Sequence, residues 1–351
     1  MQLPRLFTIG FDGLTATDQL LSLIEAGLGG VILFRRNIES PEQVLRLIGN
    51  LKRAARRPLV VSIDQEGGRV ARLRGNPWAP VPAMRVFGEA AEAERRVRAV
   101  AALLARELRA VGIDLDFAPV LDVDTNPANP VIGDRSFSRD PLAVAELGAA
   151  FVEEMQRGGV AACGKHFPGH GDTDTDSHVD LPRLRRSRTD LERIELAPFR
   201  AAIEAGVAAV MTAHVVSDAL DPDWPATLSP TAMHLLREGL AFHGVIVSDD
   251  LQMKAIADRW PIGEAAWRAL AAGCDQLLVC ENLTAAEQAI AGIAAALERG
   301  VLEEERVREA AARWDELAER YARPAAGTEG LAWLDSAGHR ARIAEVLDGL
   351  V

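Results

Sequence analysis

The chain has 351 residues, of which 48% are hydrophobic and 26% are charged, and its formal net charge at pH 7 is −12. This length suits one large barrel or two medium-sized domains, and the composition is ordinary for a globular protein with a large core. The negative charge argues against nucleic acid or an anionic membrane as a partner, because both need basic surfaces. It leaves open a small anionic substrate in a locally basic site.

Short apolar runs rich in β-branched residues recur along the chain, and each is followed by a longer amphipathic stretch. Eight of these runs are candidate strands, in chain order 6–13, 29–34, 58–64, 113–122, 159–167, 208–215, 244–250 and 275–280. Apolar strands that alternate with helices indicate a parallel sheet covered by helices on both faces. Eight of them predict a (β/α)8 TIM-type barrel of the α/β class.

A doubly wound open sheet is the alternative fold. It would place a glycine-rich phosphate loop after the first strand, but the segment "GFDGLTATDQ" contains no GxGxxG pattern. The barrel is therefore favoured. Two connecting stretches, 15–28 and 190–206, have helical patterns, and the second is expected to begin with Asp190 as its N-cap and to end at Gly206.

A polar helix is predicted over 303–321, and the pattern of 328–351 indicates a further helical appendage packed on the barrel. No repeat, low-complexity tract or linker marks a second domain. We therefore expect a single domain in which a catalytic barrel spans 1–300 and a C-terminal helical appendage spans 301–351.

The cysteines and the N-terminal segment bear on the cellular compartment. Cys163, Cys274 and Cys280 form no CxxC pair, which indicates free thiols in a reducing environment. The segment "MQLPRLFTIGFDG" lacks the basic and apolar regions of a signal peptide, and no apolar run approaches the ~18 residues of a membrane helix. We expect a cytoplasmic location.

Polar residues follow the candidate strands at the places where a (β/α)8 barrel carries its working side chains, the C-terminal strand ends and the loops after them. They are Asp64, Arg135, Lys165, His166, His214, Asp249 and Asp250. A capping role after a strand would explain Asp64 or Asp250 alone. It does not explain the whole set converging on one end of the barrel.

The densest polar stretch is "KHFPGHGDTDTDSH", residues 165–178. A metal site is one interpretation, because histidine and aspartate are metal ligands. Against it, the cation of Lys165 would repel a divalent ion, and the spacing matches neither HExxH nor an EF-hand. A purely structural loop is another interpretation, and for His170, between two glycines, we expect that structural role.

General acid/base catalysis is the third interpretation of this loop. Asp176 and His178 lie two residues apart, so the carboxylate could orient the imidazole and favour its protonated form. The other ring nitrogen would then exchange a proton near neutral pH. Asp249, at the end of a buried strand, would be the nucleophile facing it. A polar clamp for a ligand with many hydroxyls would consist of Asp64, Arg135, Lys165 and His166.

Four segments carry a resemblance to a known family: "IDQEGGRVARL", "FAPVLDVDTNPANPVIGDRSFSRDP", "GKHFPGHGDTDTDSHVDLP" and "GVIVSDDLQM". In this order they resemble glycoside hydrolase family 3, and within it the bacterial β-N-acetylhexosaminidases of peptidoglycan recycling. The long histidine-rich loop distinguishes these from the β-glucosidases of the family. Asp174 departs from the pattern, because a small neutral residue is expected there and a carboxylate could shift the pKa of His178.

The resemblance implies a retaining exo-β-N-acetylglucosaminidase that removes terminal N-acetylglucosamine from muropeptide-type substrates such as N-acetylglucosaminyl-anhydromuramyl species. It implies Asp249 rather than Asp250 as the nucleophile, and His178 with Asp176 as the acid/base dyad. It further implies that Asp64, Arg135, Lys165 and His166 hold the sugar hydroxyls. We expect no cofactor, no metal and a monomer. A phosphorylase using the same site, a metal-dependent barrel hydrolase and a non-catalytic sugar-binding barrel remain the alternatives.

Overall fold

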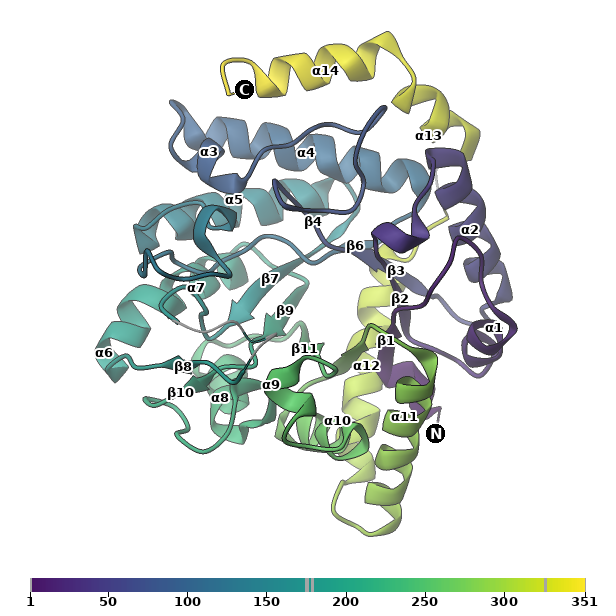
Figure 1. Cartoon of the computed structure of the whole chain (residues 1–351), viewed down its shortest axis with the longest axis vertical. Coiled ribbons are helices and arrows are strands. Elements are labelled where there is room, and N and C mark those ends of the chain that lie inside the picture. The colour runs from purple at the N-terminus through teal and green to yellow at the C-terminus, as the bar shows by residue number, and fades with distance from the viewer. Residues whose placement is uncertain (1, 174–176, 178–179, 325–326, 351) are drawn as a thin grey trace.

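The computed structural model describes residues 2–173, 177, 180–324 and 327–350 (Figure 1). Its centre is a closed parallel barrel with the strand order β1-β12-β11-β9-β7-β6-β3-β2. The strands are β1 (Phe7–Ile9), β2 (Gly30–Leu33), β3 (Val60–Ile63), β6 (Leu115–Asp116), β7 (Ala161–Phe167), β9 (Ala209–Thr212), β11 (Val245–Asp250) and β12 (Gln276–Val279). Each lies within one of the eight predicted runs. The predicted (β/α)8 fold is confirmed.

Helices surround the barrel because each has one apolar face. In α2 (Pro41–Ala54) the buried residues include Val44, Leu47, Ile48 and Leu51, the spacing of a single helix face. Ser40 caps its first turn by accepting from the amide of Gln43. The other outer helices are α1 (Asp18–Glu25), α4 (Ala93–Val111), α5 (Pro141–Arg157), α7 (Leu196–Glu204), α8 (Pro230–His234), α10 (Ile262–Ala272) and α11 (Leu283–Glu298).

One predicted helix start is wrong. The helical stretch of 190–206 begins earlier, with α6 (Arg188–Asp190), because Ser187 and not Asp190 is the N-cap. The Ser187 hydroxyl accepts from the Asp190 amide at 3.1 Å and donates to the Asp190 carboxylate at 2.8 Å. The cap formed by the Ser187 hydroxyl sets the start of the helix. The predicted end at Gly206 is confirmed by its left-handed backbone at φ +76°.

Two short ribbons lie in loops that follow barrel strands. β4 (Gln65–Gly67) and β5 (Val70–Ala71) form an antiparallel pair directly after β3, and β8 (Arg183–Leu184) pairs with β10 (Val216–Ser217). The turn of the first ribbon needs glycine, because Gly67 and Gly68 have φ values of +100° and +55°. This ribbon carries Glu66 toward the mouth of the barrel, so a loop element supplies a side chain to the site.

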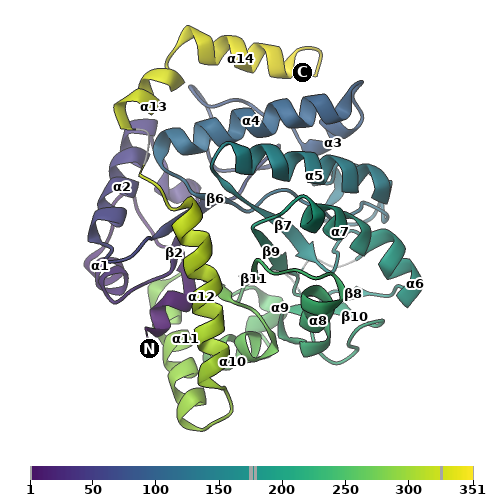
Figure 2. The same ribbon diagram turned by 180° about the vertical axis from the view of Figure 1, so that it is seen from behind.

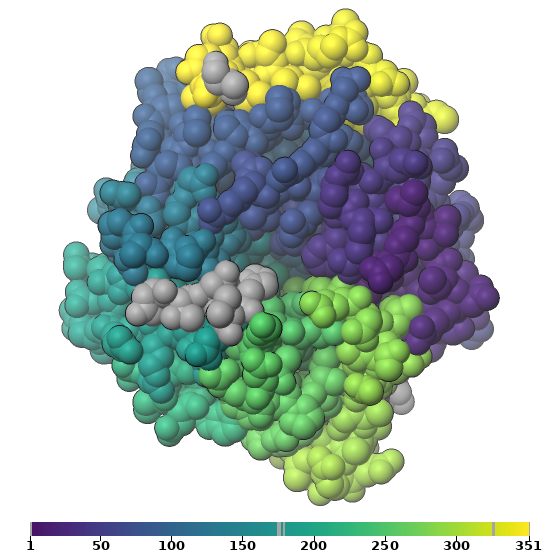
Figure 3. Space-filling view, in the orientation of Figure 1, coloured from purple at the N-terminus to yellow at the C-terminus, as the bar shows by residue number. Residues whose placement is uncertain are grey.

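The C-terminal helices cover two different parts of the barrel. α12 (Glu304–Tyr321) lies across the N-terminal end of the barrel (Figure 2), where the Trp314 indole donates to the Gly29 carbonyl at 3.0 Å. α13 (Gly327–Leu334) and α14 (Ala337–Leu347) pack on α4, and their yellow surface covers the blue one of α4 in Figure 3. The predicted helical appendage is confirmed, whereas its boundary at residue 300 stays a prediction. Within the described ranges, no helix has the length and apolarity to span a bilayer.

Candidate active site

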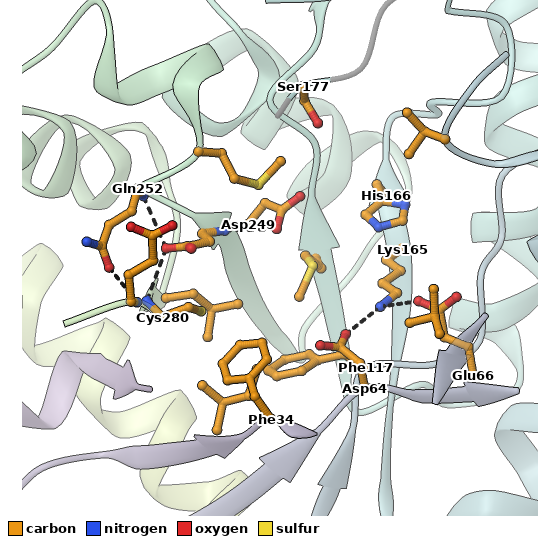
Figure 4. A pocket seen from close by; sticks show the side chains of 18 of the residues that line it. Phe34, Asp64, Glu66, Phe117, Lys165, His166, Ser177, Asp249, Gln252 and Cys280 are labelled. Atoms are coloured by element: carbon orange, nitrogen blue, oxygen red, sulfur yellow. Dashed lines mark hydrogen bonds and ion pairs between the residues drawn. The ribbon is translucent and has the colours of Figure 1, made fainter. Parts of the chain in front are cut away.

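A cavity of about 450 Å³ opens at the C-terminal ends of the barrel strands (Figure 4). Its lining includes apolar side chains that come from four of the strands or their ends: Ile32, Phe117, Met211 and Leu278. The remainder of the lining combines charged side chains with neutral ones such as Phe34 and Val131. Small-molecule sites commonly combine an apolar surface with a few converging polar groups, so this cavity is the candidate active site.

The structure brings most of the predicted site residues together. The cavity lining includes Asp64, Arg135, Lys165, His166 and Asp249. Two further predicted residues, Asp176 and His178, lie outside the described residues, as does Asp174. Ser177, which stands between the two dyad positions in the chain, is described and also lines the cavity.

A charge cluster of two acids and three cations forms one wall. Lys165 Nζ lies 2.8 Å from Asp64 Oδ1 and 2.7 Å from Glu66 Oε1. The Arg135 guanidinium makes two hydrogen bonds of 2.8 Å to the two oxygens of Glu66. Arg72 Nη2 lies 3.0 Å from Asp64 Oδ2. Such a network holds each group in one position and leaves one positive charge in excess.

Every member of this cluster is charged at neutral pH. Burial alone would raise the pKa of Glu66, but the charges of Lys165 and Arg135 outweigh it and hold that pKa well below its usual range. Burial would likewise lower the pKa of Lys165, but the carboxylates of Asp64 and Glu66 raise it. The wall is therefore a fixed set of ionic donors and acceptors that suits a ligand bearing hydroxyl groups.

His166 is oriented by a carboxylate from the neighbouring strand loop. Its Nδ1 lies 2.7 Å from Asp122 Oδ2, and its backbone amide donates to Asp122 Oδ1 at 3.3 Å. Because Asp122 accepts, Nδ1 carries a proton, and Nε2 is the ring nitrogen left for a ligand. The peptide bond between Lys165 and His166 is cis.

Asp249 and Asp250 follow one another at the end of β11 but do different things. The register between β11 and β12 shifts there, and bulges of this kind re-aim side chains near active sites. Asp249 Oδ1 accepts from the Asp250 amide at 2.8 Å. Asp250 Oδ1 accepts from the amides of Gln252 and Cys280 at 3.1 and 3.2 Å, so Asp250 ties two backbone segments together. His214 also acts on the backbone there, because its Nε2 lies 2.9 Å from the Asp250 carbonyl oxygen.

Three residues of this site were not predicted from the sequence: Glu66, Arg72 and Asp122. Asp122 ends the fourth predicted strand run, a position where the barrel rule already places working residues. Glu66 and Arg72 lie near Asp64 in the chain, but only the β4–β5 ribbon brings them to Lys165 and Asp64. The Gly67-Gly68 pair is a turn signal for the ribbon, but it does not by itself predict that the ribbon faces Lys165.

The arrangement is suited to acting on a polyhydroxylated ligand. A carboxylate at the end of a buried strand, Asp249, shares one cavity with the charge cluster and with His166. Within the described ranges, no group of three or more histidine, cysteine, aspartate or glutamate side chains is arranged to hold a metal ion.

Comparisons with known proteins agree with this geometry. The model for the N-terminal domain of glycosyl hydrolase family 3 matches residues 14–317. A β-hexosaminidase of Pseudomonas aeruginosa is 44% identical over 297 residues, covering 84% of this chain and 87% of its own. A family 3 β-N-acetylglucosaminidase from Paenibacillus superposes with a TM-score of 0.91 at 40% identity, covering 98% of this chain and 67% of its own.

NagZ of Neisseria gonorrhoeae, solved with N-trifluoroacetyl-D-glucosamine, superposes with a TM-score of 0.83 at 37% identity and covers 98% of this chain and 97% of its own. The same gonococcal protein has also been solved with a zinc ion. The barrel, the cavity at its C-terminal end and these matches lead to one conclusion: the chain belongs to glycoside hydrolase family 3 and is a glycoside hydrolase.

Proposed function

We propose that this glycoside hydrolase is a retaining exo-β-N-acetylglucosaminidase that removes terminal N-acetylglucosamine through a covalent glycosyl-enzyme. The observation that carries the proposal is the position of Asp249, at the end of β11 in the same cavity as the charge cluster and His166. The names of the relatives, β-hexosaminidase and β-N-acetylglucosaminidase, support the choice of sugar.

In the first step Asp249 attacks the anomeric carbon of the sugar. The new bond joins its carboxylate oxygen to that carbon, and the bond from the carbon to the departing oxygen breaks. His178, oriented by Asp176, gives its proton to the departing oxygen. Arg135, Lys165 and the Nε2 atom of His166 hold the ring hydroxyls, so the sugar is fixed while its anomeric carbon moves toward Asp249.

In the second step His178 takes a proton from water, and the water oxygen attacks the same carbon and releases Asp249. Two inversions return the original β configuration. A retaining enzyme needs its two reacting groups ~5 to 5.5 Å apart. Because the acid/base is a histidine, it is neutral when it acts as a base. It would repel an anionic acceptor less than a carboxylate does, so phosphate in place of water is the second candidate reaction.

The natural substrate in this proposal is a muropeptide-type N-acetylglucosaminyl-anhydromuramyl species, which would place the enzyme in peptidoglycan recycling. The proposal includes a cytoplasmic monomer that needs no metal, no cofactor and no macromolecular partner. The negative charge of −12 supports a small-molecule substrate over nucleic acid or an anionic membrane.

The specificity test compares two p-nitrophenyl substrates, the β-N-acetylglucosaminide and the β-glucoside. We expect kcat/KM for the first to exceed that for the second by at least about a hundredfold, equivalent to ~2.7 kcal/mol. Products formed with and without inorganic phosphate separate hydrolysis from phosphorolysis, because only the second yields N-acetylglucosamine 1-phosphate. Equal rates on both glycosides would refute the proposed sugar specificity.

A further inference from the structure

His170 lies in the loop after β7 and is almost fully buried, with 2% of its surface exposed. It lines the cavity without belonging to the charge cluster. Its backbone amide donates to Asp122 Oδ1 at 2.7 Å, and this is the same carboxylate that orients His166. Its backbone oxygen accepts from Asn129 Nδ2 at 2.8 Å. Two hydrogen bonds therefore hold the backbone of His170 in place, independently of the contacts made by its ring.

The hydrogen bonds of the ring have a defined direction. The Thr173 hydroxyl donates to the His170 carbonyl at 2.9 Å, so Thr173 Oγ1 accepts from His170 Nδ1 at 2.7 Å. Burial lowers the pKa of His170, which keeps the ring neutral and leaves Nε2 as an acceptor. Nε2 then accepts from the Ser177 hydroxyl at 3.4 Å. This bond is long, as is common in catalytic sites before a ligand closes them.

Ser177 is held from a second side. With 2% of its surface exposed, it is as buried as His170, and its carbonyl accepts from the Ala255 amide at 3.2 Å. Ala255 belongs to α9 (Lys254–Ala257), which follows Asp249 in the chain. In the view of Figure 4, Ser177 lies above both Asp249 and His166. Ser177 therefore joins the loop after β7 to α9, the helix that follows the proposed nucleophile in the chain.

We propose that His170 is a positioning residue for catalysis: it ties Ser177, and through the chain the two dyad positions beside it, to the Asp122 carboxylate that orients His166. This inference rests on the proposed function, because the dyad roles of Asp176 and His178 belong to that proposal. It departs from the purely structural role that the sequence predicts for His170.

The covalent chain transmits the constraint on Ser177 to the two residues bonded to it. Consecutive Cα atoms are about 3.8 Å apart, so a tether on Ser177 limits where both of its neighbours can go. Displacing a catalytic group by about 1 Å can cost roughly a hundredfold in rate. One carboxylate, Asp122, would then act on the position of the sugar-binding imidazole of His166 and, through His170, on that of Ser177.

The test removes the hydrogen bond between His170 Nε2 and the Ser177 hydroxyl and substitutes none of the proposed catalytic residues. Ser177→Ala deletes the hydroxyl, and Ser177→Thr retains it as the matched control. His170→Asn keeps a donor near the place of Nδ1 for Thr173 and deletes the Nε2 acceptor. His234→Gln, at an exposed histidine of α8, controls for loss of an imidazole elsewhere.

The readout is kcat/KM on two substrates with different needs for an acid. The disaccharide N,N′-diacetylchitobiose has a sugar leaving group that must be protonated, whereas dinitrophenolate leaves without a proton. Ser177→Ala and His170→Asn should lower kcat/KM for the disaccharide by about 10- to 100-fold, part of the 10²–10⁴ that acid/base catalysis contributes. The dinitrophenyl β-N-acetylglucosaminide should change less than about threefold, and His178→Ala should give the same pattern more strongly. Ser177→Thr and His234→Gln should match the wild type.

Equal losses on both substrates, or no loss on either, would overturn the positioning role. A fall in thermal stability with unchanged selectivity between the substrates would also overturn it and return His170 to a structural role. If the wild type itself lacks β-N-acetylglucosaminidase activity, the proposed function fails first and the inference with it. An active wild type with an unaffected Ser177→Ala variant refutes the inference alone.

Discussion

Asp249 and Asp250 show how neighbouring carboxylates receive different roles. Asp249 accepts one hydrogen bond, from the amide of Asp250, whereas Asp250 accepts two from amides of separate segments. Burial is the main cause that raises the pKa of Asp250 to about 7, and the charge of Asp249 adds to it. The sequence predicts the role of Asp249 through the family resemblance. A capping role for Asp250 was foreseeable from the sequence, but its bond to the Cys280 amide, which follows the neighbouring strand β12, was not.

The raised pKa of Asp250 predicts a pH dependence of stability. A carboxyl whose pKa rises from 3.8 to about 7 on folding stabilises the fold fully below pH 3.8, and this contribution is lost as the pH rises through 7. Asp250→Asn keeps a side-chain acceptor for the two amides but does not titrate. The melting temperature of the variant should therefore rise relative to that of the wild type between pH 5 and about 8. A constant difference across that range would mean that Asp250 ionises normally in the fold.

The charge cluster predicts the cost of removing one cation. Arg135→Met leaves Glu66 buried with Lys165 as its remaining ionic partner, so the sugar-binding wall loses both a donor and its fixed geometry. We expect kcat/KM for the aryl β-N-acetylglucosaminide to fall roughly ten- to hundredfold, which corresponds to a loss of ~1.5 to 3 kcal/mol of transition-state stabilisation. Arg188→Met, which removes an exposed arginine paired with Glu192, is the control and should leave kcat/KM unchanged. If both variants behaved alike, the sugar would be held elsewhere.

At the scale of elements, the loop after β7 is the feature that the sequence singles out, and its described parts are held at several points. Asp172 Oδ1 accepts from Thr125 Oγ1 at 2.9 Å and from Arg186 Nη2 at 2.8 Å. Farther along, Asp180 pairs with Arg259 near the end of α9 at 2.6 Å. The contacts with Thr125 and Arg259 come from two other loops, so they could not be predicted from the spacing within the loop itself.

The strands were predictable for a local reason, whereas the helix start at Ser187 was not. The barrel strands are short runs of mostly apolar residues, as a sheet covered on both faces requires, and that pattern needs no knowledge of neighbours. Ser187 lies three residues before the predicted cap, Asp190. The choice between them depends on which hydroxyl or carboxylate reaches the free amides, a matter of three-dimensional geometry.

The position of Lys165 predicts the outcome of metal removal. Because Lys165 lies within 2.8 Å of both acids that face it, its cation occupies the place that a divalent ion would need. Activity should survive exhaustive treatment with EDTA or a stronger zinc chelator. Loss of activity that added zinc restores would favour the metal-dependent alternative.

At the scale of the whole molecule, a buried pair holds the C-terminal helices to the barrel. His339 of α14 places Nε2 2.7 Å from Glu107 of α4, and its Nδ1 lies 2.7 Å from the Leu334 carbonyl. Glu107 also accepts from the Ala79 amide at 2.9 Å. Both ring nitrogens face acceptors, so the ring is protonated on both and carries a charge that the Glu107 carboxylate balances.

Breaking this pair should destabilise the fold without touching the chemistry. His339→Phe keeps a ring against Trp333 but leaves the Glu107 carboxylate buried with the Ala79 amide as its remaining partner. We expect the free energy of unfolding in urea to fall by ~3 kcal/mol. Adding Glu107→Gln should recover part of this loss, because a neutral amide still accepts from Ala79. The kcat of both folded variants should equal that of the wild type, since neither residue lines the cavity. An unchanged unfolding free energy for His339→Phe would show that the pair does not hold α14 in place.

The central claim is that Asp249 forms the covalent bond to the sugar, and trapping that bond tests it most directly. A 5-fluoro β-N-acetylglucosaminyl substrate with a good leaving group should accumulate as a glycosyl-enzyme, because the fluorine slows the second step more than the first. Peptide mass spectrometry after proteolysis should find the label on Asp249, and Asp249→Ala should bind no label and lose several orders of magnitude in turnover. A label on Asp250 or on any other residue would contradict the account.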